Sequence, residues 1–120
     1  VKDNVVITPE GRNILRGISR AYIFEICEQL DLKCIEKNIE TYDVYTADEA
    51  FMTGTPFCML PVTKLNRNDI GDARMGVVTK KLIDKWSVNM GLDIIAQIKS
   101  YSQECAELMG NSPTPYQFSK

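Results

Sequence analysis

The chain has 120 residues, of which 44% are hydrophobic and 25% are charged, and its formal net charge is -2 at pH 7. This composition is typical of one ordinary globular domain and excludes a disordered or fibrous chain. Basic residues are scattered, so no nucleic-acid partner is expected. No long apolar run is present, so we expect neither a membrane span nor a signal peptide, and a cytoplasmic protein.

The first 40 residues predict a strand, a helix and a second short strand. Residues 5–7 favour a strand, which ends at the turn signal of residues 9–11. We expect this strand to pair with a segment upstream of the chain. Residues 32–39 predict a short strand. Between the two strands, four apolar residues recur at helical spacing and predict an amphipathic helix: Ile23, Ile26, Cys27 and Leu30.

The middle of the chain predicts a helical turn and then a series of strands. Residues 41–45 favour one helical turn with Thr41 as its N-cap. Residues 49–53 and 57–65 are strand-like, and a polar Thr-Gly-Thr-Pro turn separates them. The sequence at residues 66–69 favours a tight hairpin.

A loop at residues 71–76 precedes a predicted helix from Val77, which Gly91 interrupts. Asp93 is placed to cap a further helical segment. We expect residues 1–110 to form one domain, and residues 111–120 to be a loose tail. The order of elements predicts an α/β (α+β) domain, with a mixed sheet packed against helices.

Cysteine and histidine usage limits the available chemistry. The chain has no histidine, so proton transfer would fall to Lys, Asp, Glu, Tyr or a cofactor. Its four cysteines lack the paired spacing of a zinc site, and we expect buried free thiols and no metal site. They are Cys27, Cys34, Cys58 and Cys105.

Residues 17–19 begin the first predicted helix and are a candidate anion site. A helix N-terminus presents unpaired N–H groups and a partial positive charge, and glycine lets a ligand approach the backbone. The plainer alternative is that Gly17 is a turn residue and Ser19 a cap. The Thr-Gly-Thr turn at residues 53–55 would add donors if it lies at the same end of the molecule. Otherwise it is an ordinary turn.

Three sequence blocks resemble the C-terminal portion of the class IV pyridoxal-phosphate aminotransferases, above all the branched-chain amino acid aminotransferases. They are "ILRGISR", "ADEAFMTGT", and "IGDARMG" followed by "VTKKL". The family forms are roughly "LPGITR", "ADEVFLTGT" and "IGDGKPGPVT". The resemblance covers about residues 4–85 and implies the C-terminal domain of a fold-type IV enzyme, whose N-terminal domain is not in this chain.

The resemblance implies roles at the pyridoxal 5'-phosphate cofactor. The amides of Ile18 and Ser19, after Gly17, would hold the cofactor phosphate. Leu15 would lie against the pyridine ring. Thr55 would donate a hydrogen bond to the phosphate.

On the substrate side, the resemblance points to Gly54, Thr55 and Pro56. Pro56 replaces an alanine whose N–H helps to hold the substrate carboxylate, and proline has no N–H. This departure puts the branched-chain specificity in doubt. Arg16 likewise replaces the proline before the glycine, a change that we expect to affect loop stiffness.

The resemblance implies transfer of an amino group between an amino acid and a 2-oxo acid. We also expect a homodimer or higher oligomer, because half of a two-domain protein should expose apolar surface where the other half would pack. The family's Schiff-base lysine lies upstream of the matched blocks, so we assign no catalytic residue and expect this chain alone to be inactive. A D-amino acid aminotransferase or an aminodeoxychorismate lyase would share the fold. A non-catalytic binding or assembly module is the alternative of another class.

Overall fold

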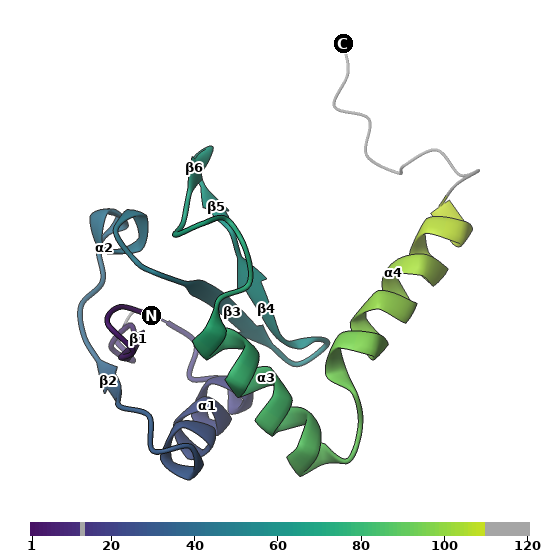
Figure 1. The fold of residues 1–120 in the computed structure, drawn as a ribbon, viewed down its shortest axis with the longest axis horizontal. Coiled ribbons are helices and arrows are strands. Elements are labelled where there is room, and N and C mark those ends of the chain that lie inside the picture. The colour runs from purple at the N-terminus through teal and green to yellow at the C-terminus, as the bar shows by residue number, and fades with distance from the viewer. Residues whose placement is uncertain (13, 110–120) are drawn as a thin grey trace.

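The computed structural model describes residues 1–12 and 14–109, so the predicted tail lies outside the described residues. Helices and strands alternate along the first half of the chain, and two helices close the second half (Figure 1). In chain order they are β1 (Val6–Thr8), α1 (Ile18–Gln29), β2 (Cys34–Glu36), α2 (Thr41–Tyr45), β3 (Ala50–Gly54), β4 (Cys58–Val62), β5 (Lys64–Leu65), β6 (Asn68–Asp69), α3 (Val77–Met90) and α4 (Ile94–Met109).

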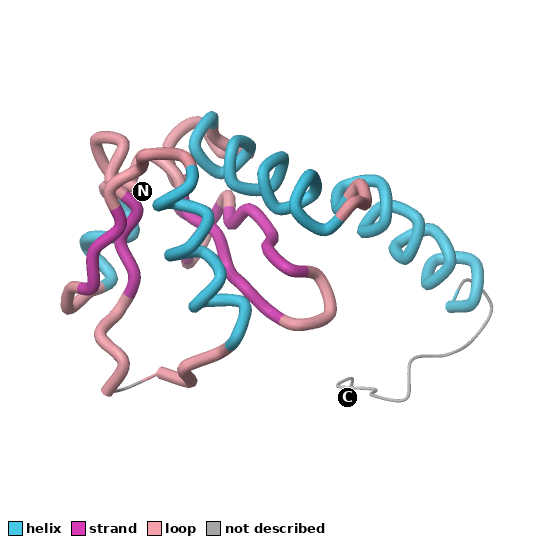
Figure 2. Tube along the Cα trace, turned by 90° about the horizontal axis from the view of Figure 1, so that it is seen from below, coloured by secondary structure: helices cyan, strands magenta, loops and turns pink. Residues whose placement is uncertain are grey.

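The described strands form three two-stranded sheets, one parallel and two antiparallel. Helix α1 lies between the parallel β1–β2 pair and the β3–β4 hairpin (Figure 2). The predicted α+β class is confirmed. The predicted hairpin at residues 66–69 is also present, because Asn66 and Arg67 adopt the positive φ angles of 49° and 69° that such a turn requires.

The first strand has a partner that the sequence did not predict, and its expected pairing with an upstream segment stays a prediction. Strand β1 pairs with β2 of the same chain, and Val6 lies opposite Cys34. The chain leaves β1, passes through α1 and returns in the same direction, which is the connection that parallel strands require. Periodicity identifies a strand but does not specify its partner.

One hydrophobic core joins α1, α3 and the β3–β4 hairpin. Its buried residues follow the predicted helical spacing in both helices. Tyr22 packs edge-on against Trp86, with ring centroids 4.9 Å apart. The buried members of the core are Val6, Ile23, Ile26, Cys27, Met59, Val78, Leu82, Ile83, Trp86 and Ile94.

The ends of three helices test the predicted caps. Helix α3 stops before Gly91, which adopts the left-handed conformation with φ of 68°. Asp93 caps α4, because its Oδ1 accepts a hydrogen bond from the N–H of Ala96 at 3.0 Å. Both predictions are confirmed. The predicted cap of α2 was wrong: Glu40 is the N-cap, with a reciprocal capping box to Asp43, and Thr41 is the first helical residue.

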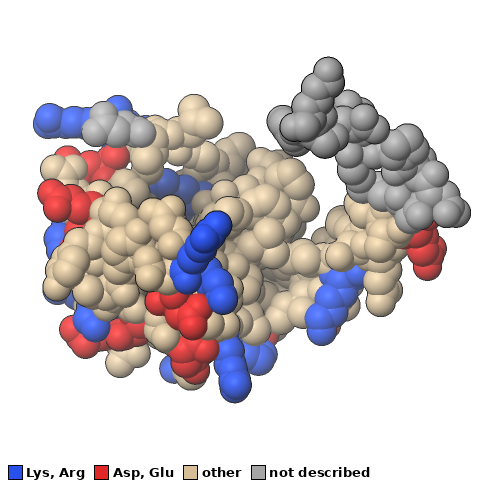
Figure 3. Space-filling view, turned by 90° about the horizontal axis from the view of Figure 1, so that it is seen from above, with Lys and Arg blue, Asp and Glu red and all other residues tan. Residues whose placement is uncertain are grey.

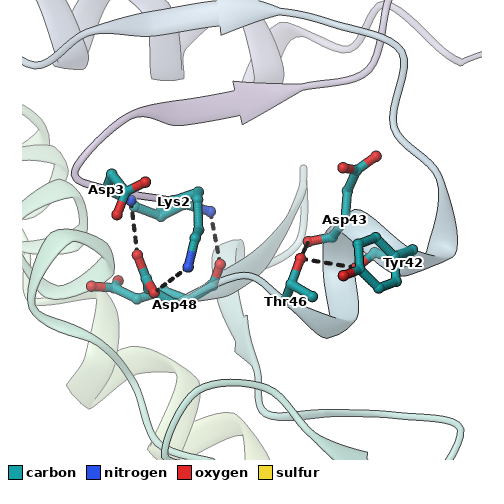
Figure 4. Close-up of polar contacts among 8 residues, drawn as sticks. Lys2, Asp3, Tyr42, Asp43, Thr46 and Asp48 are labelled. Atoms are coloured by element: carbon teal, nitrogen blue, oxygen red, sulfur yellow. Dashed lines mark hydrogen bonds and ion pairs between the residues drawn. The ribbon is translucent and has the colours of Figure 1, made fainter.

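Asp48, just before β3, ties this strand to the first turn of the chain (Figure 4). Its carboxylate accepts a hydrogen bond from the N–H of Asp3 at 2.8 Å and pairs with Lys2 Nζ at 3.1 Å. In the same view, Thr46 Oγ1 donates to the carbonyl of Tyr42 at 3.0 Å, at the end of α2. The entry to β3 is therefore held on one side by the N-terminal turn.

The cysteines are free, but they are not uniformly buried. Cys27 is buried, Cys34 and Cys58 are half-buried, and Cys105 is exposed. The prediction was therefore wrong for Cys105, because α4 extends away from the rest of the domain, as Figure 1 shows, and no neighbour among the described residues covers that part of the helix. No group of possible metal ligands occurs within residues 1–12 and 14–109.

The surface drawn in Figure 3 mixes charges of both signs, with Lys and Arg side chains lying among Asp and Glu. No single basic patch dominates the described part of this face. None of the described helices combines the length and the apolar character that a membrane crossing requires.

Candidate functional site

A cavity of about 540 Å³ lies between the start of α1, strand β1 and the end of β3. We call it the α1 cavity. Its volume lies within the range of small-molecule sites, which is about 300–1,000 Å³. Its walls include residues 17–19 and residues 53–55. The two candidate donor segments, far apart in sequence, therefore meet at one cavity.

The N-terminus of α1 presents unpaired amides at this cavity. Gly17 is the N-cap, with an extended backbone, and its carbonyl accepts the N–H of Ala21 at 3.1 Å. Among the described residues, the N–H groups of Ile18 and Ser19 have no hydrogen-bond partner. Such groups carry the partial positive charge of a helix N-terminus and favour an anion.

The amide of Gly17 differs from this expectation. Its N–H donates to the carbonyl of Leu15 at 2.9 Å, so it is not free to bind an anion. This N–H is used in a tight turn that precedes the helix. Two of the three predicted amides thus remain available.

Large apolar side chains lie beside these polar amides. Leu15 is 93% exposed and Ile18 is 89% exposed, and both contribute to the wall of the α1 cavity. Exposed apolar side chains next to hydrogen-bond donors suit a ligand with an apolar body and a charged end. The predicted position of Leu15 beside a ring is compatible with this arrangement.

The turn between β3 and β4 supplies another part of the cavity wall. Thr53, Gly54 and Thr55 contribute to the cavity, whereas Pro56 is exposed and lies outside it. The N–H of Phe57 donates to the carbonyl of Gly54 at 3.4 Å. A Cβ at Gly54 would come within 2.7 Å of the Phe57 ring, so a larger residue there would require this ring to move.

Two side chains around the site were missed by the sequence analysis. Arg20 is part of the cavity wall and binds both strands of the parallel pair. Glu49 accepts hydrogen bonds from Val78 and Thr79, and so joins β3 to the start of α3. The only available signal for Arg20 was a basic residue in the first turn of the helix. For Glu49 the signal was a predicted helix start at Val77 with no side-chain cap before it.

Comparison with known proteins identifies the family. The model of amino-transferase class IV matches residues 1–65. The branched-chain-amino-acid aminotransferase of Pseudomonas aeruginosa is 42% identical over 82 residues, which are 68% of this chain and 27% of that protein. The chain belongs to the class IV aminotransferase family.

Other members of the class IV family give the same result. The putative branched-chain-amino-acid aminotransferase of Methanocaldococcus jannaschii is 34% identical over 87 residues, 72% of this chain and 30% of that protein. The structure of the Escherichia coli branched-chain amino acid aminotransferase matches with a TM-score of 0.70 and 33% identity, over 78% of this chain and 30% of that one. The chain thus spans less than a third of the length of these relatives.

One matched structure contains a cofactor. It is a T.th. branched-chain amino acid aminotransferase with pyridoxamine 5'-phosphate. Its TM-score is 0.67 at 27% identity, over 72% of this chain and 29% of that one. The family therefore includes proteins that hold a phosphorylated pyridine cofactor.

Proposed function

We propose that this chain supplies the phosphate-binding side of a pyridoxal 5'-phosphate site in an aminotransferase. The enzyme would move an amino group between an amino acid and a 2-oxo acid. The observation that carries the proposal is the meeting of the unpaired amides of Ile18 and Ser19 with Thr55 at one cavity.

The donor set fits a phosphate group. A phosphate offers several acceptor oxygens, and the start of α1 offers two N–H groups together with the positive end of the helix. The hydroxyls of Ser19 and Thr55, which both line the cavity, add two more donors. We propose that Gly17 lets the phosphate approach, and that Leu15 lies against the ring.

The cofactor, when bound, supplies the electron sink for chemistry at the α-carbon of an amino acid. The residues of this chain would hold and orient it. The lysine that forms the covalent link, and the carboxylate that pairs with the pyridine nitrogen, would come from the remainder of the enzyme. We propose residues 1–110 as its C-terminal cofactor domain and residues 111–120 as a tail, within a homodimer.

The substrate would contact Gly54, Thr55 and Pro56 in this proposal. The names of the relatives favour a branched-chain amino acid and its 2-oxo acid. Two backbone donors are missing from this turn. Pro56 has no N–H, and the N–H of Phe57 already donates to the carbonyl of Gly54. We propose that a carboxylate at this turn relies on Thr55, with its N–H and hydroxyl.

Replacing Ile18 with proline tests the phosphate site. Position 18 is the first residue of α1 and follows an extended Gly17, the setting in which proline is tolerated. Ile18→Pro therefore deletes one N–H while the helix persists. Ile18→Ala is the matched control, since it removes the side chain and keeps the N–H.

We expect inorganic phosphate, titrated calorimetrically, to bind the Ile18→Pro variant about 5- to 30-fold more weakly than Ile18→Ala, the loss of ~1–2 kcal/mol from one donor to a charged acceptor. Circular dichroism checks that both variants keep their helices. Equal affinity of the two variants for phosphate would contradict the proposed site.

A further inference from the structure

Arg20 binds three residues from three segments, and two of these residues, Thr8 and Pro9, line the α1 cavity together with Arg20. Its Nε donates to Thr8 Oγ1 at 3.0 Å, and its Nη2 donates to the carbonyl of Pro9 at 3.0 Å. The same Nη2 pairs with Glu36 Oε1 at 2.9 Å. The side chain of Arg20 is only 16% exposed, whereas that of Glu36 is 49% exposed, so the contacts with Thr8 and Pro9 are partly buried and the ion pair lies at the surface.

The partners of Arg20 are the ends of the parallel strand pair. Thr8 is the last residue of β1 and Glu36 is the last residue of β2, while Pro9 opens the segment that leads to Gly17. Arg20 itself follows Ser19 directly in the first turn of α1. One side chain therefore fixes the helix start relative to both strands.

The chemistry of arginine suits this role. The guanidinium is planar and presents its donors in a fixed fork, so several hydrogen bonds define both its position and its orientation. Its carbon Cζ also lies 5.2 Å from the ring centroid of Phe24, one turn further along α1. A lysine would keep the charge but would not reproduce the fork.

We propose that Arg20 is a positioning residue, which holds the first turn of α1 against the ends of β1 and β2 and thereby aims the free amides of Ile18 and Ser19 into the α1 cavity. The ligand of these amides is the phosphate group of the proposed function, and the effect of Arg20 on anion binding rests on that proposal. The positioning itself is independent of that ligand.

The first experiment titrates the full chain with inorganic phosphate and follows the ¹⁵N–¹H amide signals of residues 18 and 19. Arg20→Lys keeps the charge and breaks the fork, and we expect about tenfold weaker binding together with smaller shifts of these two amides. Arg16→Lys is the matched control, because Arg16 is exposed and, among the described residues, its side chain donates a single hydrogen bond, to the Gly11 carbonyl at 3.5 Å. We expect that control to change binding less than twofold.

Two further variants separate positioning from direct attraction of the anion by the arginine charge. Thr8→Val removes one hydrogen-bond acceptor of Arg20, and Glu36→Gln weakens a second contact by removing the negative charge of the ion pair. Both variants leave Arg20 charged. Positioning predicts weaker phosphate binding in both variants. Direct attraction predicts stronger binding in Glu36→Gln, because a nearby negative charge is lost. Stronger binding there, or wild-type affinity in Arg20→Lys, would overturn the proposal.

A readout without ligand distinguishes this proposal from the proposed function. Trypsin cleavage after Arg16 and hydrogen exchange of the Ala21 amide, which donates to the Gly17 carbonyl at 3.1 Å, report on the order of the segment that Arg20 holds. We expect both rates to rise about tenfold in Arg20→Lys and Thr8→Val, and to stay unchanged in other helices. If the wild-type chain binds no phosphate, the proposed function fails. Unchanged trypsin and exchange rates in Arg20→Lys overturn the role of Arg20.

Discussion

Thr79 donates two hydrogen bonds to Glu49, one from its backbone N–H and one from its hydroxyl, each at 2.7 Å. The N–H of Val78 donates a third at 2.9 Å. Helix α3 begins after Gly76, which has no side chain to cap it. A carboxylate from the start of β3 therefore caps α3 and holds the hairpin that carries residues 53–55 against the core.

Glu49→Gln should destabilise the protein because the amide cannot accept all three hydrogen bonds, and its NH₂ group would face N–H donors. We expect the free energy of unfolding to fall by about 1–3 kcal/mol, the usual loss for hydrogen bonds to a charged group. Urea unfolding followed by circular dichroism measures it. Glu107→Gln on the exposed part of α4 is the control, and an equal loss there would contradict the capping role.

The contribution of Glu49 should depend on pH. Burial raises the pKa of Glu49, but the hydrogen bonds from Thr79 and Val78 outweigh it and hold that pKa below its ordinary value of 4.5. A lowered folded pKa gives stability that is present above 4.5 and is lost as the pH falls through the folded value. In unfolding experiments from pH 7 downward, the free energy of unfolding of the wild type should approach that of Glu49→Gln once the pH is below the folded pKa of Glu49. A constant difference would argue against this origin.

Two glycines with positive φ should respond differently to alanine. A Cβ at Gly71, where φ is 57°, would lie 2.2 Å from the carbonyl oxygen of Asp48. At Gly91, where φ is 68°, no atom of the described residues lies within 4 Å. We expect Gly71→Ala to cost about 2–4 kcal/mol, from the conformation plus the clash, and Gly91→Ala only ~1–2 kcal/mol from the conformation. Thermal unfolding of both variants tests this order, and the reverse order would refute it.

The thiols should react in the order of their exposure. Cys105 is exposed on α4, and Cys27 is buried. Contact with Cys34 and burial raise the pKa of Cys27, which keeps it a neutral thiol. In an Ellman titration of the native chain, we expect Cys105 to react first and Cys27 last, with Cys105→Ser removing the fast phase. Rapid reaction of Cys27 would show that the core opens.

The elements were more predictable than their contacts. Helices α1 and α3 follow from apolar spacing, because burial of one face leaves a periodic record in the sequence. The pairing of β1 with β2 leaves no such pattern, since the backbone groups of any strand edge can form the same hydrogen bonds. Arg20 and Glu49 act through partners on other elements, so no local pattern could reveal them. The sequence could say only that residues 53–55 would add donors if they lay near residues 17–19. The fold brings both segments to the α1 cavity.

Reduction with borohydride tests where the covalent anchor of the cofactor lies. Among the described residues, no lysine is part of the wall of the α1 cavity, so a cofactor held there by its phosphate would find no lysine amine on this wall. We expect the chain, incubated with pyridoxal 5'-phosphate and reduced, to show only scattered, substoichiometric lysine modification by peptide mass spectrometry. The same chain treated in urea is the control for random labelling. One lysine modified stoichiometrically in the native chain alone would place the anchor within these 120 residues and overturn the assignment of the chain to the phosphate side of the site.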